Sequence, residues 1–233
     1  MKYDAVIFDL FGTLVDNFPG EAFESTAADM ACCLGVPQQD FALLWNVDTW
    51  PMRVVGHFPT TEANIEHICG LLDVSVEEAL VKTAAQIRFE FSRRILVPRD
   101  DVVETLTTIK SAGSKIGLIS DCSLEVPLLW PDLPFAPFID VPIFSCSVKL
   151  KKPDPRIFLL ACEQLGVAPE RCLYIGDGGS RELSGATAVG MDAVLIRVPY
   201  EEVDEGSRTE MLQWRGARIS AIKEILAIIE NHN

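Results

Sequence analysis

Five short segments of this chain are apolar almost throughout, and this pattern constrains the fold more than any other feature. They cover residues 4–10, 115–120, 141–146, 172–177 and 192–196. Such runs are typical of strands that are buried on both faces of a sheet. Helical patterns accompany the later strands, at residues 100–113, 155–167, 181–190 and 220–233. The alternation predicts an α/β fold with a doubly wound, Rossmann-like parallel sheet.

A stretch of different character follows the first strand. Apolar residues recur there at helical spacing in four segments, which glycines and prolines separate: residues 21–35, 38–50, 61–74 and 76–96. We therefore expect an all-helical cap domain over residues 17–95. It would be inserted into an α/β core domain formed by residues 1–16 and 96–233.

Composition excludes several classes of partner. Lysine and arginine total 20 against 34 acids, a net charge of −14, so the chain repels phosphate backbones and we expect no nucleic-acid partner. No apolar run is long enough to span a membrane, and the first residues resemble a strand rather than a signal peptide. The seven cysteines form no CxxC pair, which favours reduced thiols and a cytoplasmic protein.

Polar residues gather where the predicted strands end. They are Asp9, Ser120, Asp121, Lys152, Asp177 and Glu182. The carboxyl ends of parallel strands meet at one edge of a sheet, and ligands bind at that edge. Several acids with one ammonium and one hydroxyl suit a divalent metal and an anion together.

Each of these residue types has a chemical role in such a site. Carboxylates such as Asp177 and Glu182 are the ligands that Mg²⁺ prefers, and Asp9 could act as a nucleophile as carboxylates do in aspartyl-phosphate chemistry. Lys152 could neutralise the acids and the charge on a transferring group. Ser120 could donate a hydrogen bond to an oxyanion.

The segments DLFGT, LISD, KKPDP and IGDGGSRE resemble, in this order, the four motifs of the haloacid dehalogenase superfamily. The helical insertion is similar to the type 1 cap of that superfamily, so the resemblance covers essentially the whole chain. It implies that Asp9 is the nucleophile, that Ser120 binds a substrate oxyanion and that Lys152 is the orienting cation.

The resemblance also implies a Mg²⁺ site. Asp9, Asp177 and Glu182 would hold the metal together with the main-chain carbonyl of Phe11, a role that does not depend on the Phe11 side chain. Glu182 stands where aspartate is commoner in the family, and its contact with the metal could be direct or through water.

Three further residues are candidates for substrate binding. Asp121 follows Ser120, and Thr13 lies in the turn after Asp9. Arg53, between two predicted cap helices, could reach a substrate carboxylate or phosphate, although a surface arginine is the commoner case.

Phe11 departs from the phosphatase pattern, in which the position two after the nucleophile is usually an aspartate that serves as general acid and base. The 2-haloacid dehalogenase branch often has Tyr or Phe there, because halide leaves without a proton. Asp121, Phe158 and the acidic fourth motif instead differ from that branch. The grouped acids favour a Mg²⁺-dependent hydrolase of small phosphorylated metabolites that acts through an aspartyl-enzyme intermediate.

Two alternatives stay open. A dehalogenase would displace halide with Asp9, and a non-catalytic binding protein could use the same fold. In each case the partner is a small anionic molecule. The sequence does not name the substrate, and it leaves both a monomer and a homodimer open.

Overall fold

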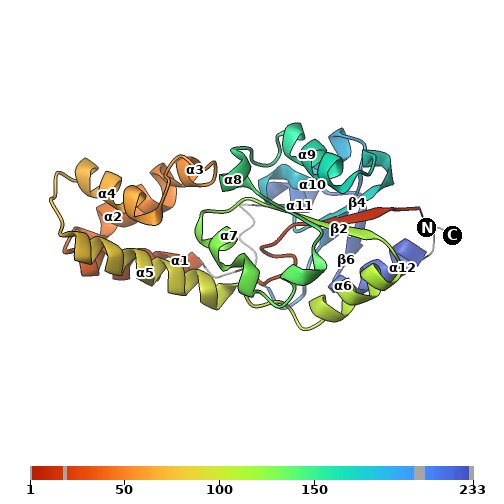
Figure 1. Cartoon of the computed structure of the whole chain (residues 1–233), viewed down its shortest axis with the longest axis horizontal. Coiled ribbons are helices and arrows are strands. Elements are labelled where there is room, and N and C mark those ends of the chain that lie inside the picture. The colour runs from red at the N-terminus through yellow and green to blue at the C-terminus, as the bar shows by residue number, and fades with distance from the viewer. Residues whose placement is uncertain (1, 18–19, 202–207, 231–233) are drawn as a thin grey trace.

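The computed structural model describes residues 2–17, 20–201 and 208–230. A six-stranded parallel sheet has helices on both faces, and a lobe of further helices lies to one side of it (Figure 1). The predicted doubly wound α/β fold is confirmed. The parts of the predicted domains at residues 1, 18–19, 202–207 and 231–233, including the end of the last predicted helix, lie outside the described residues.

The strands pair in the order β3-β2-β1-β4-β5-β6, and every pair is parallel. They are β1 (Ala5–Phe8), β2 (Lys115–Ser120), β3 (Val141–Phe144), β4 (Cys172–Gly176), β5 (Asp192–Ile196) and β6 (Ala217–Ile219). The first five coincide with the five apolar segments. The sequence did not predict β6, which is a three-residue edge strand with two exposed side chains.

Twelve α-helices fall within the described residues. They are α1 (Gly20–Leu34), α2 (Gln38–Leu43), α3 (Trp50–Arg53), α4 (Thr61–Leu71), α5 (Glu78–Ile95), α6 (Val102–Ser111), α7 (Glu125–Leu129), α8 (Ser145–Val148), α9 (Pro155–Leu165), α10 (Glu182–Ala188), α11 (Thr209–Gln213) and α12 (Ile225–Glu230). A π-helical turn, η1 (Leu44–Asp48), joins α2 to the segment before α3. Among the described helices, none is both long and apolar enough to cross a membrane.

Strand β1 shows why the sheet is covered on both faces. Successive side chains of a strand point to opposite faces. Val6 and Phe8 accordingly pack into the cluster that contains α6 and α12, whereas Ala5 and Ile7 pack into the cluster that contains α9 and α10. Both faces of β1 are therefore covered by helices, and β1 lies between β2 and β4 in the sheet.

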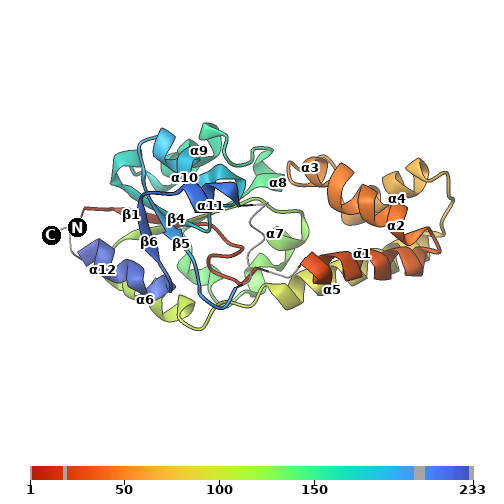
Figure 2. The ribbon, with the colours of Figure 1, turned by 180° about the vertical axis from the view of Figure 1, so that it is seen from behind.

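Helices α1 to α5 form the lobe beside the sheet, and Figure 2 shows them at the end of the molecule opposite β6 and α12. A separate apolar cluster stabilises the lobe, and all its buried members lie between Ala27 and Ala85. Helix α4 begins after Thr60, whose hydroxyl accepts a hydrogen bond from the Ala63 amide at 3.1 Å. We propose that residues 17–95 form a cap domain over the α/β core.

The order of the strands places three predicted site segments side by side. Strand β1 lies between β2 and β4, with Phe8 opposite Leu118 on one side and Ile175 on the other. Asp9 directly follows β1, and Ser120 is the last residue of β2. The carboxyl ends of these neighbouring strands lie at the edge of the sheet that faces the lobe of α1–α5 (Figure 1).

Candidate active site

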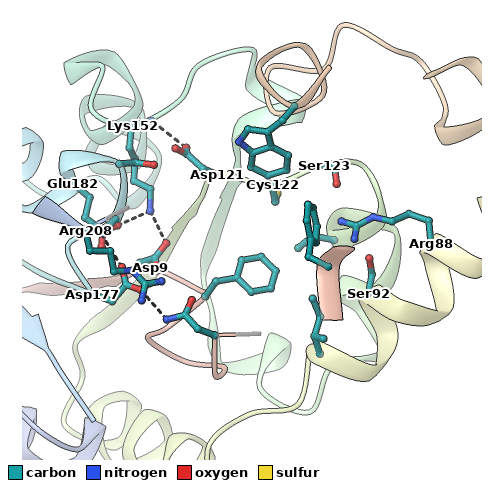
Figure 3. Close-up of a pocket in the computed structure, with 18 residues that line it drawn as sticks. Asp9, Arg88, Ser92, Asp121, Cys122, Ser123, Lys152, Asp177, Glu182 and Arg208 are labelled. Atoms are coloured by element: carbon teal, nitrogen blue, oxygen red, sulfur yellow. Dashed lines mark hydrogen bonds and ion pairs between the residues drawn. The ribbon is translucent and has the colours of Figure 1, made fainter. Parts of the chain in front are cut away.

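A cavity of about 220 Å³ lies at this edge of the sheet, between the strand ends and the lobe of α1–α5. On the core side its walls contain five acidic or basic residues that the sequence predicts for the site: Asp9, Asp121, Lys152, Asp177 and Glu182. Figure 3 shows these side chains grouped on one side of the cavity, with Arg88 and Ser92 of the cap on the other. The fold thus brings together residues that are up to 173 positions apart in the sequence (182 minus 9).

Lys152 lies at the centre of this group. Its ammonium donates to Asp9 Oδ1 and to Glu182 Oε2, each at 2.5 Å, and it is almost completely buried. Burial by itself lowers the pKa of a lysine, but the Asp9 and Glu182 carboxylates outweigh that effect and hold the pKa of Lys152 well above its usual range. Lys152 therefore remains a cation.

Asp9 is also buried, at 5% exposure. Its Oδ2 accepts a long hydrogen bond of 3.3 Å from the Thr13 hydroxyl. Thr13 thus contacts the expected nucleophile, although it is not among the residues that line the cavity. Burial raises the pKa of Asp9 to about 6, although Lys152 opposes this effect, and Asp177 adds repulsion.

Asp177 and Glu182 approach Asp9 closely, so that one carboxylate oxygen from each of the three lies within 4.8 Å of the others. Two glycines make this approach sterically feasible. Gly12 has φ = 76°, and a Cβ there would lie 2.0 Å from Asp177 Oδ2. A Cβ on Gly176 would lie 2.2 Å from Glu182 Oε1.

Each of the two acids is oriented by hydrogen bonds. Glu182 accepts from the Tyr174 hydroxyl at 2.9 Å and from the Gly178 amide at 3.0 Å, and Asp177 accepts from the Gly179 amide at 2.8 Å. Burial raises the pKa of Glu182 well above its usual value, with added repulsion from Asp9. Such a group of acids needs a nearby cation to stay ionised.

Ser120 and Asp121 follow at the end of β2. The Ser120 hydroxyl is fully buried and makes no hydrogen bond to any described residue, and Ser120 is not among the residues that line the cavity. Asp121 lines the cavity, and its Oδ1 accepts a hydrogen bond from the Lys152 amide at 3.0 Å. Asp121 thus fixes the loop that carries Lys152.

Phe11 and Arg53 lie in different environments. Phe11 is half-buried and lines the cavity, so its side chain faces the space where a substrate would react. Arg53 is the last residue of α3 and is buried; its Nη1 donates to the Trp45 carbonyl at 2.7 Å and to the Thr49 hydroxyl at 2.8 Å. Arg53 is not part of the cavity wall beside Asp9, because it is folded back against its own lobe.

Sequence reasoning missed two arginines of the cavity. Arg208 donates from Nη2 to Asp177 Oδ2 at 2.7 Å, and no motif indicated it. Arg88 of α5 lines the opposite wall. A signal for Arg88 existed, because it continues the buried helical stripe of Val81, Ala84 and Ala85, where a charged residue is unusual.

Comparison with known proteins agrees with this arrangement. The family model described as haloacid dehalogenase-like hydrolase matches residues 3–190. A phosphoglycolate phosphatase of Shigella boydii is 28% identical over 209 residues, which cover 84% of this chain and 81% of that protein. A glyceraldehyde 3-phosphate phosphatase of Methanopyrus kandleri is 32% identical over 124 residues, or 52% of each chain.

A solved structure, the 2-haloacid dehalogenase of Pseudomonas syringae, superposes with a TM-score of 0.72 at 20% identity and covers 99% of this chain and 100% of that one. That similarity concerns the fold. Because the family model matches most of the chain and the buried acids and lysine converge in one cavity, the chain belongs to the haloacid dehalogenase-like hydrolases.

Proposed function

We propose that this hydrolase is a Mg²⁺-dependent phosphatase that acts on a small phosphorylated metabolite through an aspartyl-phosphate intermediate on Asp9. The observation that carries the proposal is the group of three buried carboxylates around Lys152 in one cavity. Both relatives named above are phosphatases, which supports the same reaction here.

The acids fit a divalent metal. When all three are ionised, Asp9, Asp177 and Glu182 carry three negative charges, while Lys152 and Arg208 supply two positive ones. One negative charge is left over in a buried site, and hard carboxylate oxygens are suitable ligands for Mg²⁺. The Phe11 carbonyl is proposed as a further ligand. When bound, the metal would neutralise charge on the phosphoryl oxygens.

The residues of the chain would carry out the remaining chemistry. A carboxylate oxygen of Asp9 attacks phosphorus, the bond to the leaving oxygen breaks, and water then cleaves the aspartyl phosphate to regenerate Asp9. Lys152 holds Asp9 in place and offsets the charge on the transferred group. The Ser120 hydroxyl, which has no protein acceptor among the described residues, is proposed to donate to a substrate oxygen.

Phe11 restricts the substrate. It lines the cavity but cannot give a proton to a leaving oxygen, so substrates with good leaving groups, such as acyl or aryl phosphates, would react best. The same position of Phe11 favours a second candidate function, the displacement of halide from a 2-haloacid by Asp9, since halide needs no proton.

One comparison tests these alternatives. Phosphate release from 4-nitrophenyl phosphate is measured with Mg²⁺ and with EDTA, and chloride release from 2-chloropropionate is measured under the same conditions. We expect phosphate release that requires Mg²⁺ and is lost in Asp9→Asn. Chloride release that persists in EDTA, without phosphate release, would establish the dehalogenase instead.

Several finer assignments belong to this proposal. The lobe of α1–α5 is proposed to be a type 1 cap, and Asp121 is proposed to contact a small anionic substrate. The cytoplasm is the proposed location, on the basis of seven cysteines that are free in the structure.

A further inference from the structure

The wall of the cavity opposite Asp9 holds a second polar group. Arg88 and Ser92 lie on consecutive turns of α5, and Ser123 follows β2; all three line the cavity. Arg88 is only 6% exposed, yet its Nε and Nη1 atoms make no hydrogen bond within the part of the chain that is described. Figure 3 shows its guanidinium directed from α5 toward the cavity. Unsatisfied donors at this depth are costly unless a ligand accepts from them.

The charges around Arg88 do not cancel. Its Nε lies 3.8 Å from Glu125 Oε1, but that carboxylate already accepts hydrogen bonds from the hydroxyls of Thr61 and Ser123. A second buried guanidinium, Arg53, shares the same carboxylate as its counter-charge. Burial, with added repulsion from Arg88, lowers the pKa of Arg53 to about 9.

Two arginines against one glutamate leave one positive charge at the junction of cap and core. A buried charge without a partner is strongly unfavourable. A monoanion bound beside Arg88 would balance it, and a carboxylate matches the planar fork of a guanidinium.

Apolar side chains also line the cavity. Phe11, Phe23, Trp50 and Val126 line the same cavity, and the guanidinium of Arg88 lies over the Phe23 ring at 5.2 Å. The cavity thus has one side suited to a phosphoryl group, a cationic side opposite it, and apolar residues in its lining.

We propose that the substrate carries a phosphoryl group at one end and a carboxylate at the other, and that Arg88, with Ser92, binds this carboxylate. The proposal rests on the proposed phosphatase function for the phosphoryl end alone. The number of carbon atoms between the two groups is the variable that the experiment determines.

The test measures binding by calorimetry, in the presence of Mg²⁺ and without turnover. Phosphonocarboxylates with one to four methylene groups are compared with alkylphosphonates of the same length, which lack the carboxylate. At the length that spans the cavity, we expect the carboxylate to tighten binding by about ten- to a hundred-fold, as hydrogen bonds to a charged group do. Arg88→Gln should abolish this difference between the two series of ligands.

Arg93→Gln provides the matched control, because Arg93 is on the same helix but its side chain is 59% exposed. It should keep the full preference. If Arg88→Gln does not fold, Arg88→Lys takes its place. Lysine keeps the positive charge but lacks the planar guanidinium, so the preference for the phosphonocarboxylate over the alkylphosphonate should fall about tenfold. No preference at any length, or a preference that is undiminished in the Arg88 variants, would overturn the proposal, as would a bisphosphonate of the best length that binds more tightly than the phosphonocarboxylate.

The two proposals can fail separately. If 4-nitrophenyl phosphate is not hydrolysed but the carboxylate preference depends on Arg88, the binding site stands and the phosphatase function falls. If Mg²⁺-dependent hydrolysis is found without the carboxylate preference, the phosphatase function stands and the carboxylate-binding site falls.

Discussion

The ammonium of Lys152 lies 2.5 Å from Oε2 of Glu182, a carboxylate with no exposed surface. The same ammonium holds Asp9 at 2.5 Å. Lys152 therefore links Asp9, the proposed nucleophile, to Glu182, which is proposed to help bind the metal. Because all three groups are buried, the charge of each depends on the presence of the other two.

Replacement of Lys152 by methionine should be costly in two ways. It leaves Asp9 and Glu182 as uncompensated buried acids, so we expect the free energy of unfolding to fall by about 3–5 kcal/mol. Hydrolysis of 4-nitrophenyl phosphate should fall at least about a hundred-fold. Urea unfolding and steady-state kinetics measure both effects, and Lys151→Met, at an exposed neighbour, should change neither. A Lys152→Met variant as stable and active as the parent would contradict this account of the site.

Arg208 should compete with a metal for Asp177. Its guanidinium is 2.7 Å from Asp177 Oδ2, and a cation there reduces the attraction of the site for a second cation. We expect Arg208→Gln to tighten Mg²⁺ binding, by roughly three- to tenfold for a pair this close to solvent. Calorimetric titration with MgCl₂ gives the affinity, and Arg156→Gln, at a side chain that is 71% exposed, controls for the change in net charge. Weaker binding in Arg208→Gln would mean that Arg208 instead organises Asp177 for the metal.

The buried strands and the strand-end acids were predictable from the sequence, because parallel strands are apolar on both faces and a carboxylate directly after such a run stands out. The edge strand β6 was not predictable in this way. It is three residues long, two of its side chains are exposed, and its pairing with β5 depends on tertiary contacts.

The far end of the cavity was harder to predict, because sequence spacing does not show which lobe a long side chain faces. Arg53 was a candidate for substrate binding, and in the structure it donates to the backbone of its own lobe at Trp45. Arg88 was overlooked, although it occupies a core position on α5. Only the packing of α5 against α7 of the core shows that this position opens into the cavity.

Glu125 should make the free energy of unfolding depend on pH in the acidic range. Burial raises its pKa, but Arg88 and the Ser123 and Thr61 hydroxyls outweigh this effect, and the pKa is lowered from 4.5. Its stabilising contribution is therefore present above the unfolded pKa of 4.5 and is lost as pH falls through the lower folded value. The test is urea unfolding at several pH values below 4.5. As pH falls, the free energy of unfolding of Glu125→Gln should decrease less steeply than that of the parent, by up to about 1.4 kcal/mol per pH unit. An unchanged slope would contradict the pairing, and Glu163→Gln, at an exposed acid, should leave the slope as it is.

Phe11→Asp should widen the range of leaving groups. The side chain at position 11 lines the cavity two residues after Asp9, so a carboxyl group there could protonate an alkoxide as it departs, a contribution of about 10²–10⁴ in rate. An aryl leaving group needs little of this help, and the ratio of alkyl to aryl phosphate hydrolysis should therefore rise by about a hundred-fold. Asparagine has nearly the shape of aspartate but no carboxyl proton to donate. Phe11→Asn should therefore leave the ratio of alkyl to aryl phosphate hydrolysis near that of the parent. If both variants shift the ratio equally, the effect comes from space rather than from acid catalysis. If neither does, position 11 does not reach the leaving oxygen.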